Sequence, residues 1–587
     1  MQQVERIFDL LPHGLEKFGA DHLVVAGKED GKWIEYTLNQ FDNYVQDISS
    51  GLIELGVEPG QKIATISNNR PEWNFLDMAI MQIGAVHVPI YPTISQADYE
   101  YILNHAEVQY VFVAGWELFR KIEHIIKNIS SLKDIYTFKE LRNYKHLNEL
   151  IQLGRDHSHE DEINNRRKKI TKDHCATLIY TSGTTGNPKG VMLSHDNLIS
   201  NFKAVSWIPP IGPQSRALSY LPLCHVYERM LNYMYQYKGT TIYYAENLGT
   251  IVDNLKEIKP QIMTSVPRLL EKIYDRIISK GRKLKGIQKG IFFWAVNLGL
   301  NYGHNKNIVY KLQLKLANAL VFKKWREALG GEFRLIVSGG AAIQPRLARV
   351  FWAARIPVLE GYGLTETSPV IAVSHFGKNG VRFDAVGPVL RGVDVNIADD
   401  GEILVKGPNV MQGYYKEPEM TSEVIDSEGW FHTGDIGMMK SNHLKITGRK
   451  KEVFKTSFGK YVSPQPIENK LKESSFIENA MVVGENQKFA GALISLDFDH
   501  LKSWCNIKGI EYTTNEEMIQ LPRIRNRIKK EIDELNQQFG ETEQVKRFAL
   551  IPLTWSMENK ELTPTLKLKR DVISRNYQKE IQDIFRN

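Results

Sequence analysis

The stretch YTSGTTGNPKG, from Tyr180 to Gly190, combines residue types that bind phosphate groups. Its glycines let the backbone turn tightly and aim N–H groups inward, four hydroxyl side chains add donors, and a lysine adds positive charge. A Walker loop requires G-x-x-x-x-G-K-[ST], and that order is missing here. The stretch therefore predicts a polyphosphate-binding loop of another class. The residues expected to contact phosphate are Thr181, Ser182, Gly183, Thr184, Thr185, Gly186 and Lys189.

The elements around this loop follow the pattern of an α/β protein. ATLIY before it predicts a strand and HDNLISNF after it predicts the start of a helix, so the loop is expected at a strand-to-helix switch. Upstream, apolar residues spaced by three and four predict a helix over 41–55, followed by the strand KIATIS. This alternation predicts largely parallel sheets covered by helices. VDVNIADDGEILVKG instead predicts two antiparallel strands around an Asp-Gly turn.

The chain of 587 residues is too long for a single hydrophobic core. A boundary is expected near 445–455, where a short strand runs into a basic turn and a compact α+β pattern begins. The predicted domains are 1–450, a large N-terminal α/β domain with a small antiparallel β piece, and 451–587, a small α+β domain.

Composition narrows the setting in which the protein works. Three cysteines lie far apart, which excludes a disulfide framework and fits a reducing, cytoplasmic location. The first residues lack the apolar core of a signal peptide, and the longest apolar stretches are shorter than the about 20 residues that cross a bilayer. A net charge of +7 gives no reason to expect a nucleic-acid partner. We therefore expect a soluble or peripheral cytoplasmic protein.

A basic region extends from Lys272 to Arg326. It holds 13 Lys and Arg residues and one acidic residue, Asp275, interleaved with Ile, Leu, Phe and Trp. One interpretation is a solvated helical face. The other is a surface that meets anionic lipid headgroups or an acidic ligand.

Four further motifs accompany the loop, in the order YGLTE, HTGD, ITGRKKEVFK and PTLKLKR. Together they resemble the adenylate-forming (AMP-binding) superfamily of acyl-CoA synthetases, luciferases and nonribosomal-peptide adenylation domains, over essentially the whole chain. VPRLLEKIYDRI, the basic region after it, and Leu566 where other branches place Gly resemble the long-chain fatty acyl-CoA synthetases. The resemblance implies an N-terminal domain that binds ATP and the acyl group, and a mobile C-terminal lid domain.

The resemblance also implies roles for individual residues. Lys189 would hold the β- and γ-phosphates, Thr365 would contact the α-phosphate, and Glu366 with Thr181 would hold Mg²⁺. A glutamate beside a triphosphate would repel it unless a cation lay between them. The segments expected to flank adenine are Gly339, Gly340 and Ala341, and Glu360, Gly361, Tyr362 and Gly363.

Residues in the last third of the chain would complete the site. Asp435 would accept hydrogen bonds from the ribose hydroxyls, and Arg449 would close on ribose and phosphate. Lys451 matches the hinge between the domains, and Gly459 would let the pantetheine of coenzyme A pass close to the backbone. Lys567 matches the lysine that acts in adenylation. Lys567, rather than Lys569 or Arg570, is assigned this role only because of its position in the family motif.

One histidine is a candidate for the acyl site. LPLCHVYER resembles the segment that lines the acyl pocket, and His225 would lie at the pocket's mouth. A structural histidine is the alternative. Cys224 has no paired base and is expected to pack in the core.

The predicted function is an ATP-dependent long-chain fatty acid–CoA ligase that forms acyl-AMP and pyrophosphate, then acyl-CoA and AMP. Fatty acid, ATP and coenzyme A would be substrates, with Mg²⁺ as cofactor. Three alternatives stay open: a CoA ligase for a medium-chain or aryl acid, an acyl-AMP ligase that loads a carrier protein, and a catalytically silent nucleotide- or acyl-binding protein. Acyl chain length and oligomeric state are also open, with a homodimer as one option.

Overall fold

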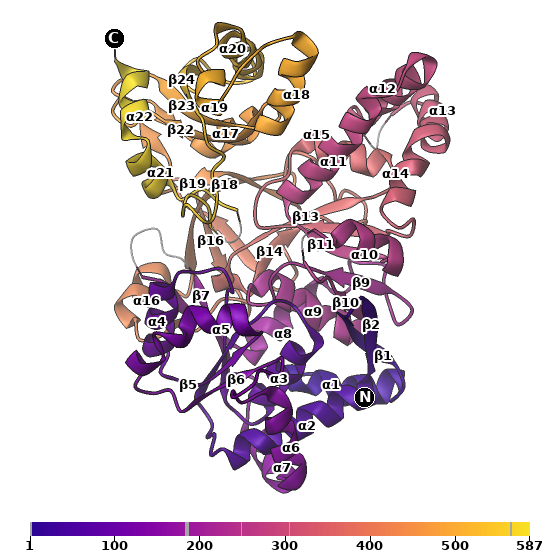
Figure 1. The fold of residues 1–587 in the computed structure, drawn as a ribbon, viewed down its shortest axis with the longest axis vertical. Helices are drawn as coiled ribbons and strands as arrows, with labels where there is room; N and C mark the ends of the chain where they lie inside the picture. The colour runs from indigo at the N-terminus through magenta and orange to yellow at the C-terminus, as the bar shows by residue number, and fades with distance from the viewer. Residues whose placement is uncertain (1–2, 182–186, 248, 304–305, 564–565, 587) are drawn as a thin grey trace. The chain divides into compact units, whose positions relative to one another are not determined.

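The computed structural model describes residues 3–181, 187–247, 249–303, 306–563 and 566–586 (Figure 1). The chain forms two compact units: Met1–Val395 with Leu404–His432, and Asn396–Ile403 with Thr433–Asn587. Residues 433–450 thus belong to the second compact unit. The predicted domain boundary between residues 450 and 451, with the hinge at Lys451, stays a prediction.

A seven-stranded sheet of the first unit carries the phosphate-loop strands. Strands β3, β4, β5, β6 and β7 pair in parallel, whereas β8 pairs antiparallel with both β7 and β17. The spatial order is β17 (Gly413–Tyr414), β8 (Lys189–Ser194), β7 (Cys175–Thr181), β4 (Val86–Ile90), β3 (Lys62–Ile66), β5 (Val108–Val113) and β6 (Asp134–Thr137).

An eight-stranded sheet forms the other half of this unit. Its six inner strands pair in parallel, and its two edge strands, β14 and β2, pair antiparallel. The order is β14 (Val370–Val373), β13 (Val358–Gly363), β12 (Leu335–Ser338), β11 (Ile262–Ser265), β9 (Arg216–Ser219), β10 (Thr241–Tyr244), β1 (Leu23–Glu29) and β2 (Lys32–Thr37). The predicted α/β class with largely parallel sheets is confirmed.

Helices cover both sheets, and their starts follow local sequence signals. Thr37 caps α2 through a capping box with Gln40, and Pro71 occupies the first turn of α3. These helices are α1 (Leu10–Phe18), α2 (Leu38–Glu54), α3 (Pro71–Gln82), α4 (Gln96–His105), α5 (Trp116–Glu123), α6 (Leu147–Asp156), α7 (Glu160–Lys169), α8 (His195–Val205), α9 (Val226–Lys238), α10 (Ile251–Ile258), α15 (Pro345–Ala353) and α16 (Pro418–Val424), with the 3-10 turns η1 (Ile7–Asp9), η2 (Ile126–Asn128) and η4 (Thr365–Thr367).

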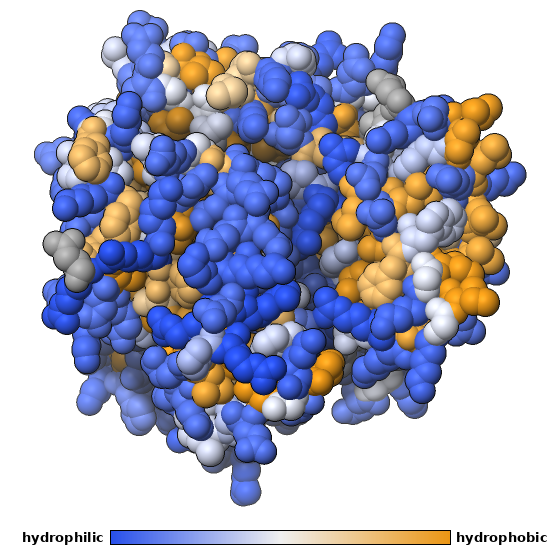
Figure 2. All heavy atoms as spheres, turned by 90° about the horizontal axis from the view of Figure 1, so that it is seen from above, coloured by the Kyte–Doolittle hydropathy of each residue, from blue (hydrophilic) through white to orange (hydrophobic). Residues whose placement is uncertain are grey.

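The basic region folds into a run of helices, in which α12 and α13 lie side by side (Figure 1). The run consists of α11 (Pro267–Arg282), α12 (Gly286–Leu300), α13 (Ile308–Ala317), the π-helical turn η3 (Asn318–Phe322) and α14 (Lys323–Ala328). Figure 2 shows an apolar patch (orange) on the right, the side on which Figure 1 places these helices.

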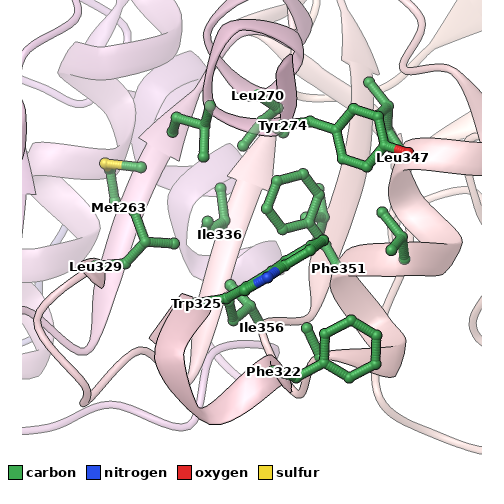
Figure 3. Packing of buried hydrophobic residues seen from close by; sticks show 14 of the residues in the cluster. Met263, Leu270, Tyr274, Phe322, Trp325, Leu329, Ile336, Leu347, Phe351 and Ile356 are labelled. Atoms are coloured by element: carbon green, nitrogen blue, oxygen red, sulfur yellow. The ribbon is translucent and has the colours of Figure 1, made fainter. Parts of the chain in front are cut away.

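The inner faces of this run pack on the eight-stranded sheet (Figure 3). Phe322 and Trp325 meet Phe351 of α15 and Ile336 of β12 in one buried cluster. Burial of such large apolar side chains contributes roughly 1.5–3 kcal/mol each. The basic region is therefore anchored as part of the first unit's core.

The second unit contains a three-stranded sheet, in which β22 (Ile477–Val483) pairs antiparallel with β23 (Ala490–Leu496), and β23 pairs parallel with β24 (Val545–Ile551). Its helices are α17 (Pro464–Leu471), α18 (Phe498–Lys508), α19 (Asn515–Met518), α20 (Pro522–Asn536), α21 (Arg570–Asn576) and α22 (Gln578–Phe585).

The predicted strand pair at the Asp-Gly turn is present as neighbours β15 (Asp394–Ile397) and β16 (Glu402–Lys406), with Gly401 at φ +84°.

One local expectation is wrong. The phosphate loop joins two antiparallel strands, β7 and β8, instead of leading from a strand into a helix. Helix α8 starts only at His195, capped by Ser194, so the six residues of β8 separate its N-terminus from the loop. The backbone N–H and C=O groups of KGVMLS find hydrogen-bond partners by pairing with β7. The loop therefore ends at Lys189, the first residue of β8.

Candidate functional site

The two ends of the phosphate loop are held together by the strand pairing. Thr181 and Lys189 lie opposite each other in the register of β7 and β8, and both are half-buried. A Cβ at Gly190 would lie 3.1 Å from the ring of Tyr180, whose hydroxyl lies 2.7 Å from Nδ1 of His105. The intervening candidates Ser182, Gly183, Thr184, Thr185 and Gly186 lie outside the described residues.

The Thr365–Glu366 turn follows β13 directly. A Cβ on Gly363 would lie 1.7 Å from the carbonyl oxygen of Pro369, so only glycine fits there. The backbone N–H of Leu364 donates to Thr367 Oγ1 at 3.0 Å, which closes the turn. Thr365 and Glu366 are both half-buried, as expected for side chains that meet a ligand.

A tyrosine links this turn to the loop. The hydroxyl of Tyr414 donates to Glu366 Oε1 at 2.9 Å, and Lys189 Nζ lies 5.0 Å from the centroid of the Tyr414 ring. The structure thereby brings Lys189 and Glu366 together, although they are far apart in sequence. The sequence reasoning missed Tyr414, because the strand pairing that places it there leaves no local spacing signal.

The two segments expected at adenine leave neighbouring parallel strands at the same edge. Ser338 at the end of β12 pairs with Glu360 of β13, so Gly339–Ala341 and Glu360–Gly363 both lie at the carboxyl end of the sheet, where α/β proteins bind nucleotides. Gly340 has φ +80°, a conformation that favours glycine. Burial raises the pKa of Glu360 to about 7, and its carboxylate accepts from the backbone N–H of Ile343 at 3.1 Å.

His225 caps helix α9. Its Nδ1 accepts from the backbone N–H of Tyr227 at 3.1 Å, and its ring lies 6.4 Å from that of Tyr91. This half-buried histidine therefore has a structural role as the N-cap of α9. Its location at the mouth of an acyl pocket stays a prediction. Cys224 is buried and burial raises the pKa of its thiol, as expected for a packing residue.

In the second unit, Asp435 and Arg449 face each other across two strands. They are paired in the register of β18 (Phe431–Lys440) and β19 (His443–Arg449), with Arg449 Nε 3.5 Å from Asp435 Oδ1. The backbone N–H of Asp435 donates to Thr433 Oγ1 at 3.1 Å, which fixes its strand position. A carboxylate and a guanidinium thus lie side by side, and their roles at ribose and phosphate stay predictions.

The residues after β19 lie in exposed turns. Lys451 is exposed in the turn where the backbone N–H of Glu452 donates to Arg449 O at 2.9 Å. Gly459 has φ +77° in the turn between β20 (Phe454–Lys455) and β21 (Tyr461–Val462). An exposed turn with a glycine offers backbone to a passing ligand.

Lys567 lies exposed on a short hairpin. Its backbone N–H donates to Thr563 Oγ1 at 3.0 Å, and its carbonyl accepts from the N–H of Thr563 at 2.8 Å. Arg570, one of the rival candidates, is held by Glu468 at 2.6 Å and Glu452 at 3.4 Å. Arg570 is therefore engaged in ion pairs within the second unit, whereas the side chain of Lys567 lies at the surface.

The donor set fits a magnesium ion that arrives with a triphosphate. Among the described residues, no cluster of three or more His, Cys, Asp or Glu side chains forms a ready-made metal cage. Mg²⁺ commonly takes one or two protein carboxylates plus substrate phosphates and water. The half-buried carboxylate of Glu366 and the hydroxyl of Thr181 suit that mode.

The fold is that of an α/β protein with two compact units, and candidate nucleotide-binding residues occur in each. The chain belongs to the AMP-binding enzyme family: the model of this family matches residues 13–415, and that of the AMP-binding enzyme C-terminal domain matches residues 452–587.

Full-length relatives carry a consistent description. The chain is 31% identical to the long-chain-fatty-acid–CoA ligase FadD15 of Mycobacterium bovis, over 97% of this chain and 95% of the relative. It is 32% identical to the peroxisomal long chain acyl-CoA synthetase 7 of Arabidopsis thaliana, over 97% of this chain and 84% of the relative.

A solved structure shares the fold. The A domain of carboxylic acid reductase from Segniliparus rugosus, in complex with AMP and a co-purified carboxylic acid, superposes with a TM-score of 0.76 at 18% identity, over 100% of this chain and 95% of that one. At this identity the match concerns the fold alone.

Proposed function

We propose that this protein is a long-chain fatty acid–CoA ligase. The observation that carries the proposal is full-length similarity to long-chain-fatty-acid–CoA ligases at about 31% identity. ATP and a fatty acid give acyl-AMP and pyrophosphate, and coenzyme A then displaces AMP to give acyl-CoA. Adenylation is needed because a carboxylate oxygen is a poor leaving group and AMP is a good one.

The first unit supplies the groups that meet ATP. Lys189 binds the β- and γ-phosphates, Thr365 contacts the α-phosphate, and Tyr362 stacks on adenine. Thr181 and Glu366 would hold Mg²⁺, which would supply positive charge against the triphosphate. The geometry that supports these roles is the contact of Lys189 and Glu366 with one tyrosine.

The second unit supplies the mobile groups. Asp435 accepts from the ribose hydroxyls, Arg449 binds ribose and phosphate, and Lys567 stabilises the charge that develops at the carboxylate and α-phosphate. Rotation about Lys451 exchanges this arrangement for one in which Gly459 meets the pantetheine of coenzyme A. The exposure of Lys451, Gly459 and Lys567 supports these assignments.

Separate half-reactions test the role of Lys567. Lys567→Ala should slow fatty-acid-dependent pyrophosphate exchange by at least about 100-fold, since an electrostatic contact to the transition state is lost. Conversion of supplied acyl-AMP to acyl-CoA should keep its rate. Lys569→Ala, on the same hairpin, is the matched control. Unchanged exchange in Lys567→Ala would refute the assignment.

Substrate panels separate the alternatives. Saturated and unsaturated acids from short to long, assayed for pyrophosphate release, should peak at long chains. A peak at medium-chain or aryl acids would replace the proposal with the corresponding ligase. Product masses with coenzyme A and with a phosphopantetheinyl carrier protein distinguish a CoA ligase from a carrier-loading enzyme. A protein that binds ATP without releasing pyrophosphate would be catalytically silent.

We also propose that residues 272–326 dock on an anionic membrane at the cytoplasmic face. Ile308, Leu312 and Leu316 recur every four residues on α13 and are 74%, 64% and 53% exposed, beside Lys311 and Lys315. Such a helix can lie in the membrane interface with its apolar stripe inserted. No helix in the described ranges combines the length and apolar character needed to span a bilayer.

Liposome sedimentation tests this docking. The protein should bind vesicles with anionic lipid more tightly than neutral ones, and salt should weaken the binding. Leu312→Ser with Leu316→Ser should release it, whereas Ile507→Ser, at a residue 80% exposed in the second unit, should not. Equal binding to both vesicle types without salt dependence would exclude this proposal.

A further inference from the structure

We infer that Tyr414 is a positioning residue that fixes Lys189 and Glu366 as a preformed pair for a metal-bound triphosphate. The inference rests on the proposed adenylation chemistry. It concerns a buried tyrosine, 6% exposed, that touches both residues.

The contacts use both ends of the tyrosine side chain. Its hydroxyl donates to Glu366 Oε1 at 2.9 Å, and its ring face lies 5.0 Å from Lys189 Nζ. A hydrogen bond to a carboxylate and an ammonium over an aromatic face are both charge-assisted contacts. One rigid side chain therefore holds a negative and a positive group at a fixed separation.

The backbone around Tyr414 is tied to both partners' elements. On the loop side, Tyr414 pairs with Val191 of β8, and the N–H of Tyr415 donates to Gly190 O at 2.8 Å. On the turn side, the N–H of Met411 donates to Glu366 O at 2.8 Å.

Two side chains secure the same segment further. Asn409 Nδ2 donates to Thr367 O at 3.0 Å, and the N–H of Tyr414 donates to Thr421 Oγ1 at 2.9 Å. Residues 409–415 thus form a strap across the start of β8 and the Thr365–Thr367 turn. Tyr414 is the strap residue whose side chain reaches both functional groups.

The arrangement has a chemical consequence. Donation from Tyr414 to Oε1 orients the carboxylate of Glu366, and its other oxygen stays available to a cation. Ordering ligand groups before binding removes an entropic cost from the affinity for the metal-bound nucleotide. Loss of the hydroxyl should therefore weaken the metal-dependent part of binding, and loss of the ring should also weaken the part that depends on Lys189.

Tyr414→Phe and Tyr414→Leu separate the two contacts. Calorimetric binding of a non-hydrolysable ATP analogue is measured with Mg²⁺ and in EDTA. Tyr414→Phe should weaken binding about tenfold with Mg²⁺, the size expected for a hydrogen bond to a charged group, and leave binding in EDTA unchanged. Tyr414→Leu should weaken both. Tyr415→Phe, the neighbouring tyrosine, is the matched control and should behave as the unmutated protein.

Two activity readouts accompany the binding. In pyrophosphate exchange, Tyr414→Phe should raise the half-saturating Mg²⁺ concentration about tenfold, and conversion of supplied acyl-AMP to acyl-CoA should keep its rate. Because Tyr414 acts through Glu366, Tyr414→Phe should add no further change in Mg²⁺ dependence to Glu366→Gln.

The outcomes decide the inference. Mg²⁺ dependence of Tyr414→Phe equal to that of the unmutated protein would overturn it. So would equal weakening with and without Mg²⁺, or equal loss in both half-reactions, because either result indicates a general packing role. Exchange can use any carboxylate that the unmutated protein activates, so failure of the long-chain proposal leaves this test intact.

Discussion

Removing one member of the buried ion pair between Asp77 and Arg229 should destabilise the first unit strongly. The two side chains are 1% and 0% exposed. Arg229 also donates to Thr177 Oγ1 at 2.7 Å and to the Tyr233 hydroxyl at 2.6 Å, and that hydroxyl donates to Asp77 Oδ2 at 2.6 Å. Burial acts to raise the pKa of Asp77, but Arg229 and the hydrogen bonds from His87 and Tyr233 outweigh it and lower this pKa.

The expected size follows from this geometry. Leaving one buried charge without its partner costs about 3–5 kcal/mol. A unit of roughly 400 residues unfolds with an entropy near 0.8 kcal/mol/K, so Arg229→Met should lower its unfolding midpoint by about 4–6 °C. The exposed pair Arg155–Asp47 is the control, because Arg155→Met should cost less than about 1 kcal/mol.

Calorimetric scans at several pH values provide the assay. In Arg229→Met the pKa of Asp77 should rise above its unfolded value, because burial then acts without the guanidinium. The folded variant would bind a proton that the unfolded chain releases, so its stability should fall as pH rises from 5 to 8. Asp77→Asn should show only the pH slope of the unmutated protein, without this added part. A midpoint change below 1 °C in Arg229→Met, or an equal loss at all pH values, would refute the reasoning.

Three further perturbations probe other sites. Burial raises the pKa of Glu228 from 4.5 to about 7, so this group should lower stability by on the order of 3 kcal/mol as pH rises through that window. Glu228→Gln should remove this part of the slope, and pH profiles of the calorimetric midpoint that run parallel in the variant and the unmutated protein would contradict the reasoning. Leu566 has φ +61°, so Leu566→Gly should relieve up to about 1 kcal/mol of backbone strain. Pyrophosphate exchange in this variant should stay within about twofold of the unmutated rate, and a large loss of exchange would contradict this prediction. A Cβ on Gly154 of α6 would lie 1.8 Å from Asp47 O of α2, so Gly154→Ala should lower the free energy of unfolding by roughly 1–3 kcal/mol. Gly115→Ala is the control and should not destabilise the protein, because a Cβ there meets open space. Equal unfolding midpoints for the two variants would count against the packing argument.

Local patterns in the sequence predicted the α/β class and the family correctly. The helices α2 and α3 were recognisable because capping residues and apolar spacing act within a few residues. The strand β8 was missed. Its six residues contain a short apolar run, and only pairing with β7 on one side and β17 on the other makes it a strand. The helix predicted from HDNLISNF is present as α8, but placing the loop at a strand-to-helix switch was wrong because β8 lies between them.

The sequence by itself determined the kinds of chemical group available: a glycine- and hydroxyl-rich loop with Lys189, a lone glutamate at residue 366, and basic motifs near the C-terminus. Only the tertiary structure decided which of these groups meet. It placed Tyr414 between Lys189 and Glu366, and it engaged Arg570 with Glu468 while exposing Lys567. The physical reason is that residue type and short-range spacing are encoded locally, whereas strand register and burial arise from contacts between segments far apart in the chain.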